Sequence, residues 1–194
     1  MKIVFKIISQ LRLLAALAVL AAAVPARADQ VYFTPRDLLG DFFRSSQNVT
    51  YKKIQLDDGA RQRLQHRLGY TPSKQSYTFY VATSGGHVDG YALIDEEKGE
   101  HQPITFAVKL SPAGKIERQE IVIYREARGD EVRDEKFRHQ FVGKGPSDAI
   151  TTEQDIMAVS GATISSRAMA VGVKRAVVLF DELVKPTVVV TASR

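Results

Sequence analysis

The chain has no cysteine among its 194 residues, and its four histidines are scattered. The absence of cysteine excludes disulfides, cysteine-ligated iron–sulfur clusters and haem attached through thioether bonds. None of the histidines has the spacing of a metal site (His66, His87, His101 and His139). A redox group in this protein must therefore be held by something other than cysteine or clustered histidine.

Long apolar runs are equally scarce, and the single clear one lies near the N-terminus. Residues 13–24 form an uninterrupted apolar run behind a positively charged leader, and Ala26-Arg27-Ala28 follows as a small-x-small sequence. A bilayer-spanning helix needs about 20 apolar residues, which is more than this run contains. The pattern predicts a secretory signal peptide over residues 1–28, with cleavage after Ala28 and export to the periplasm.

The remaining chain lacks a strong excess of either charge. Four of the 27 lysines and arginines lie in the predicted signal peptide, which leaves 23 basic residues against 22 acidic ones. Nucleic-acid binding requires a concentrated basic face. We therefore expect no nucleic-acid partner.

Residues 29–76 are predicted to be an N-terminal helical extension. Thr34 and Pro35 are typical of a helix start, and this helix should end near Arg44. A second amphipathic helix is expected from Asp57 to Leu68, because Gly69 fits the position just beyond a helix end.

The period of the pattern changes after residue 76. Four segments alternate or are rich in β-branched and aromatic residues, which predicts an antiparallel meander of about four strands over 77–82, 88–94, 104–110 and 116–124. Tight turns are expected at Ser84–His87 and Ser111–Gly114, and a bulge at Gly90. These strands open the predicted main domain, residues 77–186.

Helices are predicted after the strands. A short polar helix is expected over 134–141, and a long one from Ser165 or Ser166 to Val184, before Pro186. The apolar stripe of the long helix needs a sheet to cover it. The predicted fold class is α+β: an antiparallel sheet meander packed by a long C-terminal helix, with short N-terminal helices. Residues 187–194 form a tail.

The segment just before the long helix is the candidate site. It reads Ser160-Gly161-Ala162-Thr163-Ile164-Ser165-Ser166. A helix start offers unpaired N–H groups and a partial positive charge, which suit a phosphate. The Thr163 hydroxyl could contact a phosphate or be esterified to one. Gly161 permits an unusual backbone conformation, Ala162 leaves room, and Ser160, Ser165 and Ser166 could donate to phosphate oxygens or cap the helix.

The same residues are also typical of an ordinary serine-rich helix start after a glycine turn. The isolated motif therefore leaves a structural role and a phosphate site both open.

The motif resembles the flavinylation motif of the FMN-binding domain. That domain occurs in the C subunit of the sodium-translocating NADH:quinone reductase and in the G subunit of the Rnf complex. In this family a flavin transferase joins the phosphate of FMN to the threonine of Ser-Gly-Ala-Thr, which corresponds to Thr163. The resemblance covers roughly residues 77–184 and also rests on segments 90–92, 102–108, 114–116, 120–126 and 137–144.

The resemblance departs from the family at one position. The family usually has an aspartate six residues before the modified threonine, where this chain has Met157. Asp155 lies two residues earlier and would have to act in its place. The departure bears on covalent attachment more than on the fold.

The resemblance implies an exported FMN protein that carries electrons rather than an independent enzyme. Its expected partners are the flavin transferase and membrane or envelope redox proteins. Two alternatives stay open: FMN held without a covalent bond, and a non-redox envelope protein that keeps the fold for interaction. A hydrolase is a poor fit, because Ser160 and Ser165 have no evident His and Asp partners.

Overall fold

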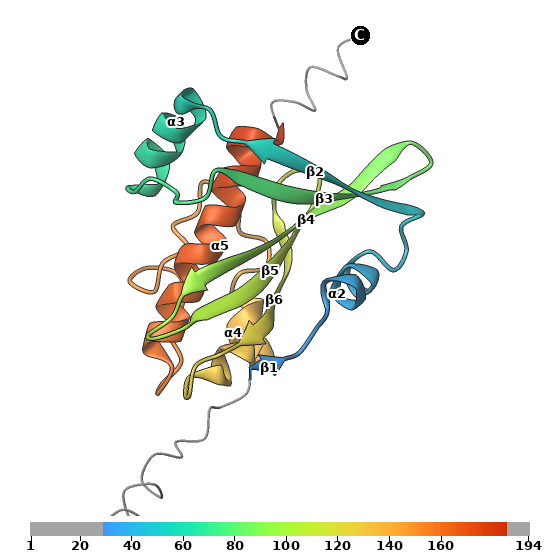
Figure 1. Cartoon of the computed structure of the whole chain (residues 1–194). Coiled ribbons are helices and arrows are strands. Elements are labelled where there is room, and N and C mark those ends of the chain that lie inside the picture. Colours follow the sequence, from blue (N-terminus) through green and yellow to red (C-terminus); the bar gives the residue numbers. More distant parts are fainter. Residues whose placement is uncertain (1–28, 186–194) are drawn as a thin grey trace, which may run out of the picture.

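The computed structural model describes residues 29–185 (Figure 1). The predicted signal peptide and the tail over 187–194 lie outside this range. Within residues 29–185, none of the helices is both long and apolar enough to cross a membrane.

A six-stranded antiparallel sheet forms the centre of the molecule, in the order β1-β6-β5-β4-β3-β2. The four predicted strands are confirmed. The strands are β1 (Gln30–Val31), β2 (Asn48–Gln55), β3 (Ser76–Ser84), β4 (His87–Lys98), β5 (Pro103–Leu110) and β6 (Ile116–Tyr124). Ala82 pairs with Gly90 and Thr83 with Val88, so the register shifts at this point and Asp89, next to Gly90, is the extra residue of β4. The predicted bulge is therefore present.

Helices cover both faces of the sheet. Helix α5 (Thr163–Leu183) packs on one face and α2 (Pro35–Phe42) on the other (Figure 1). Successive side chains of a strand point to opposite faces, so Phe106 belongs to the core under α5 and Ala107 to the smaller core under α2. Strand β5 is consequently buried along nearly its whole length. The predicted α+β class is confirmed.

Helix α5 approaches the sheet closely at Gly172. A Cβ atom at this residue would lie 2.7 Å from the Phe106 ring, which is inside van der Waals contact. The missing side chain lets the helix axis sit low over β5. Because α5 is long and fixed in this way, its first turn has a defined position at one end of the sheet.

The N-terminal extension contains the two predicted helices. Thr34 caps α2 by accepting a hydrogen bond from Asp37 N, and Asp57 caps α3 (Asp58–Leu68) through Ala60 N. Helix α3 is joined to α5 by ion pairs from Arg67 to Asp181 (2.8 Å) and Glu182 (2.9 Å).

The extension also supplies strand β2, which the sequence patterns missed. All eight residues of β2 pair with β3, yet nearly all of its side chains are exposed on both faces. A strand exposed on both faces has no apolar alternation, which is the signal used to find strands. The extension is therefore part of the sheet as well as helical.

The helix predicted over 134–141 is confirmed in a shorter form, and a separate 3-10 helix precedes it. A 3-10 helix, η1 (Asp130–Arg133), is followed by α4 (Glu135–His139). These elements pack beside β6 and the first half of α5, and the chain then passes through a long loop to residue 162.

Candidate functional site

Thr163 is the first residue of α5, and it is exposed. The residue before it, Ala162, occupies the N-cap position, and no side chain caps the helix. The hydrogen bond from Ser166 N to Ala162 O (2.8 Å) closes the first turn. The helix thus begins two or three residues earlier than predicted, and it places the Thr163 hydroxyl beside first-turn N–H groups that no side chain occupies.

A tight turn leads into the helix. Ala162 N donates to Val159 O (3.0 Å), and Gly161 has a φ of +83°. A Cβ atom at Gly161 would meet no other atom within 4 Å, so there is room for a side chain. Glycine is required here by the positive φ and not by crowding. Ser160 and Gly161 are exposed, whereas Ala162 is buried. Open space therefore remains beside Thr163.

Ser165 and Ser166 do not cap the helix, and that expectation is wrong. Their side chains are buried, with exposed fractions of 5% and 0%. The Ser166 hydroxyl accepts a hydrogen bond from Val159 N (3.0 Å), and the Ser165 hydroxyl lies 2.9 Å from the Tyr124 hydroxyl. Both serines face inward from the first turn and fasten it, so neither hydroxyl is presented to a ligand as Thr163 is.

The loop after β6 lies against this first turn. Tyr124 donates its hydroxyl proton to Arg128 O, so Ser165 is the donor in the hydrogen bond between Ser165 and Tyr124. Burial raises the pKa of Tyr124 to about 12, and the tyrosine therefore keeps its proton at neutral pH. Gly129 packs against Ser165, because a Cβ at Gly129 would lie 2.6 Å from the Ser165 oxygen.

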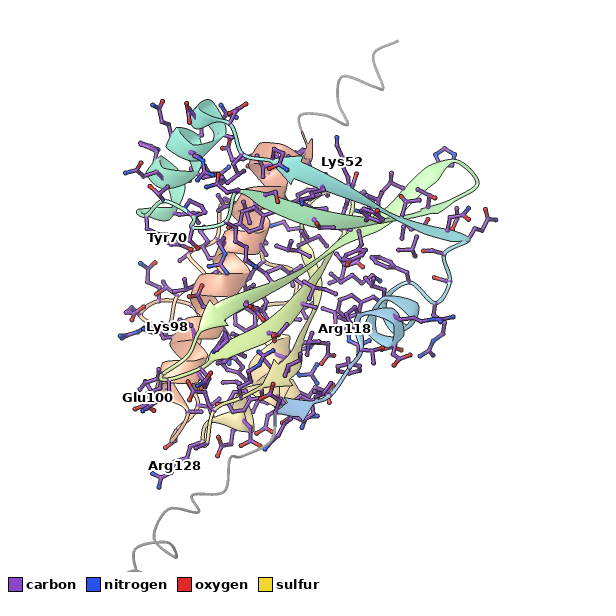
Figure 2. All side chains as sticks on the ribbon, viewed as in Figure 1. Lys52, Tyr70, Lys98, Glu100, Arg118 and Arg128 are labelled. Atoms are coloured by element: carbon purple, nitrogen blue, oxygen red, sulfur yellow. The ribbon has the colours of Figure 1, made fainter. Side chains whose placement is uncertain are left out.

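A buried carboxylate joins two loops at this end of the sheet. Glu126 accepts hydrogen bonds from His101 N (2.6 Å) and Gln102 N (3.0 Å), which fixes the β4–β5 loop beside the loop after β6. Between the two loops lies a groove of about 420 Å³. Figure 2 shows Glu100 and Arg128, which line it, at the same end of the molecule as the start of α5. In the sequence, Glu126 is the last residue of segment 120–126, which resembles the family, and no local pattern marks it.

The segment upstream of the motif is also held in place. The Gln140 side-chain amide bonds both backbone groups of Met157, accepting from its N–H (2.7 Å) and donating to its carbonyl oxygen (3.1 Å). The Met157 side chain is 77% exposed. This chain therefore presents an apolar side chain where the family usually has a carboxylate.

Asp155 is not free to replace the missing aspartate. Its carboxylate bonds Lys144 Nζ (2.8 Å) and accepts from Thr151 N (3.0 Å). Burial alone would raise the pKa of Asp155, but the hydrogen bonds from Lys144 and from backbone N–H groups hold that pKa below its usual value. The carboxylate is thus committed to the loop in which it lies.

Arg167 is the cation that lies one helical turn beyond Thr163. Residues four apart on a helix are neighbours on its surface, so the guanidinium is on the Thr163 side of α5. It pairs with Glu153 at 2.9 Å, and both side chains are exposed. Such a pair is weak, which leaves Arg167 able to turn toward an anion. Within residues 29–185 no group of three His, Asp or Glu side chains could hold a metal ion.

These features fit a phosphate. An exposed hydroxyl, an uncapped helix start and a nearby cation converge on one point, and the turn before it leaves room. Comparison with known proteins then identifies the domain, because residues 99–178 match the family model of the FMN-binding domain. The match runs from the end of β4 through most of α5. The predicted family and the predicted cofactor, FMN, are confirmed.

The FMN-binding domain here has a relative among curated proteins, the G subunit of the proton-translocating ferredoxin:NAD(+) oxidoreductase complex of Clostridium ljungdahlii. The two are 36% identical over 107 residues, which cover 51% of this chain and 57% of the relative. The chain therefore spans little more than half the length of that relative. The crystal structure of Shewanella oneidensis NqrC matches with a TM-score of 0.47 and 19% identity, over 69% of this chain and 79% of that one.

Proposed function

We propose that this protein carries FMN bonded through its phosphate to the Thr163 hydroxyl oxygen and passes electrons between redox proteins of the cell envelope. The observation that carries the proposal is the exposed Thr163 at the uncapped start of α5, in a domain whose cofactor is FMN. Flavin supplies the electron chemistry, and the protein supplies attachment, orientation and electrostatic support.

Attachment requires a flavin donor whose phosphate carries a leaving group. The oxygen of Thr163 bonds to phosphorus, its proton passes to solvent or to a base of the transferase, and the leaving group departs with the bonding electron pair. The resulting diester keeps one negative charge. The first-turn N–H groups of α5 and the positive end of its dipole stabilise this charge.

The residues of the motif then have separate roles. Gly161 turns the chain so that Thr163 projects from the surface, and Ser160 lies beside it in the turn. Ala162 anchors the turn in the core. Ser165 and Ser166 support the site from behind, since their hydroxyls bond Tyr124 and Val159 N. Arg167 is placed to pair with the diester.

The location and the partners belong to the same proposal. A signal peptide over residues 1–28 would deliver the chain to the periplasm, where a covalent bond keeps the cofactor from diffusing away. The relative from Clostridium ljungdahlii belongs to an oxidoreductase complex, which supports an electron-carrying role. The partners are a flavin transferase and membrane or envelope redox proteins. In the proposed domain organisation the extension (29–76) precedes the flavin domain (77–186) and the tail (187–194).

Intact-protein mass spectrometry tests this function. The full-length chain is expressed with a flavin transferase in the export compartment of the host. We expect a protein that begins at Asp29 and whose mass is raised by one FMN less one water. Thr163→Ala should lose the added mass, and Thr50→Ala, at an exposed threonine of β2, should keep it. Colourless wild-type protein from a host with an active transferase would contradict the proposal.

Met157 favours a second candidate, in which the same site holds FMN without a bond. The family's carboxylate is missing there, and Asp155 is bound to Lys144. Acid precipitation separates the two candidates. Flavin that stays with the precipitate is covalently attached, and flavin released to the supernatant is not.

A further inference from the structure

A second groove, of about 450 Å³, lies along α5 beyond the proposed attachment point. It is formed by the loop after α3 (residues 70–74), Tyr77 of β3, the end of β4 (residues 95–98), and Val171 and Arg175 of α5. Figure 2 labels Tyr70 and Lys98 on this side of the molecule. Most of the groove comes from residues 70–98, which precede the segment matched by the family model.

The floor of the groove is a buried ionic cluster. The side chains of Arg175 and Asp95 are only 9% and 1% exposed, and their atoms lie 2.8 Å and 3.0 Å apart. The other donors of Arg175 reach the Glu97 carboxylate, Glu96 O (2.8 Å) and the Tyr70 hydroxyl (3.4 Å). All five N–H groups of the guanidinium are thus engaged, so Arg175 shapes the floor and is not free to bind a ligand.

The Tyr77 hydroxyl makes no hydrogen bond to this cluster within the described residues. Tyr77 is only 4% exposed, yet no described residue hydrogen-bonds its hydroxyl. In the part of the chain that the structure describes, the Gln119 side-chain oxygen alone is both fully enclosed and without a hydrogen-bond partner. The Tyr77 hydroxyl therefore reaches accessible space, and the groove is the space that Tyr77 lines. A buried hydroxyl without a partner is costly unless a ligand or water completes it.

Several side chains that line the groove have hydrogen-bond donors to offer a ligand. Burial raises the pKa of Tyr70 and raises that of Tyr77 to about 12, so both hydroxyls keep their protons. Lys74 Nζ spends one N–H on Asp95 (2.5 Å) and has two left. The carboxylates of Asp95 and Glu97 are already bonded to Lys74 and Arg175.

The walls and the charges define the remaining chemistry. Two phenol rings, Pro72 and Val171 give flat, apolar walls. The charged side chains of the lining are three cations and three anions, which favours an uncharged ligand (Lys74, Lys98 and Arg175; Asp95, Glu96 and Glu97). We propose that this groove binds a neutral, planar aromatic ring that carries carbonyl acceptors, with the Tyr77 hydroxyl donating to one carbonyl.

Such a ring has two sources. One is the isoalloxazine ring of FMN attached to Thr163, since Val171 lies about 12 Å further along the helix axis at 1.5 Å per residue. The other is a separate, diffusible aromatic carrier such as a quinone, which would exchange electrons with FMN. The first source rests on the proposed attachment at Thr163, and the second does not.

Ligand titration of a flavin-free protein tests the groove itself. Full-length Thr163→Ala protein is titrated with lumiflavin, which has the flavin ring without phosphate, and with menadione, by fluorescence and calorimetry. We expect saturable binding of both probes. Adding Tyr77→Phe keeps the buried ring and removes one hydrogen bond, so binding should weaken about threefold to tenfold. Tyr51→Phe, a change at an exposed tyrosine of β2, is the matched control and should change nothing.

The flavin-loaded protein then distinguishes the sources. If the attached ring fills the groove, menadione no longer binds and Tyr77→Phe shifts the flavin absorption bands. If the ligand is diffusible, menadione binds the loaded and flavin-free proteins equally. The proposal is overturned if neither probe saturates the Thr163→Ala protein, or if Tyr77→Phe binds as tightly as Tyr51→Phe. Colourless wild-type protein would refute the attachment and leave this binding result unaffected.

Discussion

The start and the middle of α5 use polar groups in opposite ways. At the start, Thr163 is exposed and no side chain caps the helix, so donors are left available. In the middle, every donor of Arg175 is bonded to a residue of β4 or to Tyr70, and the cluster is enclosed. The difference separates the place where we propose that a ligand is attached from a place that holds elements together.

The contrast also separates two costs of mutation. A polar group exposed to water loses little when its partner is removed, whereas a buried charge left alone is strongly destabilising. Substitutions along the helix should therefore change stability most in the middle and flavin content most at the start. Four predictions test this contrast, three on α5 and one in the loop before it, from the largest expected change in the free energy of unfolding to the smallest.

Arg175→Met should be the most destabilising. It leaves the partly exposed Glu97 without its cation and the buried Asp95 with Lys74 alone, which we expect to cost about 3 kcal/mol in the free energy of unfolding, the lower end for breaking a buried ion pair. Urea denaturation measures this loss. Arg63→Met is the matched control, because Arg63 pairs with Glu182 but is largely exposed. Equal losses in the two variants would remove the contrast between buried and exposed pairs.

Ser166→Ala should be the next most destabilising. It deprives Val159 N of its hydrogen-bond partner at a partly buried position, at a cost of about 1–2 kcal/mol. The turn that presents Thr163 should also become less ordered, which faster hydrogen exchange at residues 159–162 would report. Ser160→Ala, at an exposed serine in the same turn, serves as the control. Unchanged exchange in Ser166→Ala would show that Ser166 does not hold the turn.

Asp155→Asn should change the response to acid. The folded protein lowers the pKa of Asp155, so this group stabilises the fold above the pKa it has in the unfolded chain and loses that contribution as the pH falls through its folded value. The variant should therefore unfold with a weaker pH dependence below about pH 4, near the reference value for aspartate. Melting temperatures between pH 3 and pH 7 measure the effect, and an unaltered acid limb would contradict it.

Thr163→Ala should affect stability least. The side chain is exposed and makes no hydrogen bond within residues 29–185, so the expected change is within about 0.5 kcal/mol. Flavin content should nevertheless fall to background. A melting temperature that drops as far as that of Ser166→Ala would mean that Thr163 is a structural residue. The proposed difference between the start and the middle of α5 would then be wrong.

Local patterns in the sequence predicted most of the fold. Strands β3 to β6 alternate or are continuously apolar, and the helices α2 and α3 carry capping residues. Strand β2 was missed because it is held by pairing with β3 while its side chains stay in water. Strand β2 is stabilised by pairing with β3, more than twenty residues away in the sequence. A local sequence pattern does not contain this information.

The structure corrects one part of the site prediction, the capping role of Ser165 and Ser166, and the flavin site itself stays a prediction. Thr163 and Gly161 could be chosen because a hydroxyl and a glycine before an apolar helix have a local meaning. The roles of Ser165 and Ser166 depend on contacts with Tyr124 and Val159, which the sequence does not display. The Arg175 cluster was missed for the same reason, since its members are up to 105 positions apart.

The hydrogen bond between Ser166 and Val159 has a consequence for how electrons would leave the protein. This bond ties the turn to the first residues of α5, and the hydrogen bond between Ser165 and Tyr124 ties those residues to β6. The backbone that carries a cofactor on Thr163 would therefore be held in place. The cofactor would move mainly through its own sugar-alcohol chain. If FMN is attached as proposed, a redox partner would have to reach this end of the domain to exchange electrons with it.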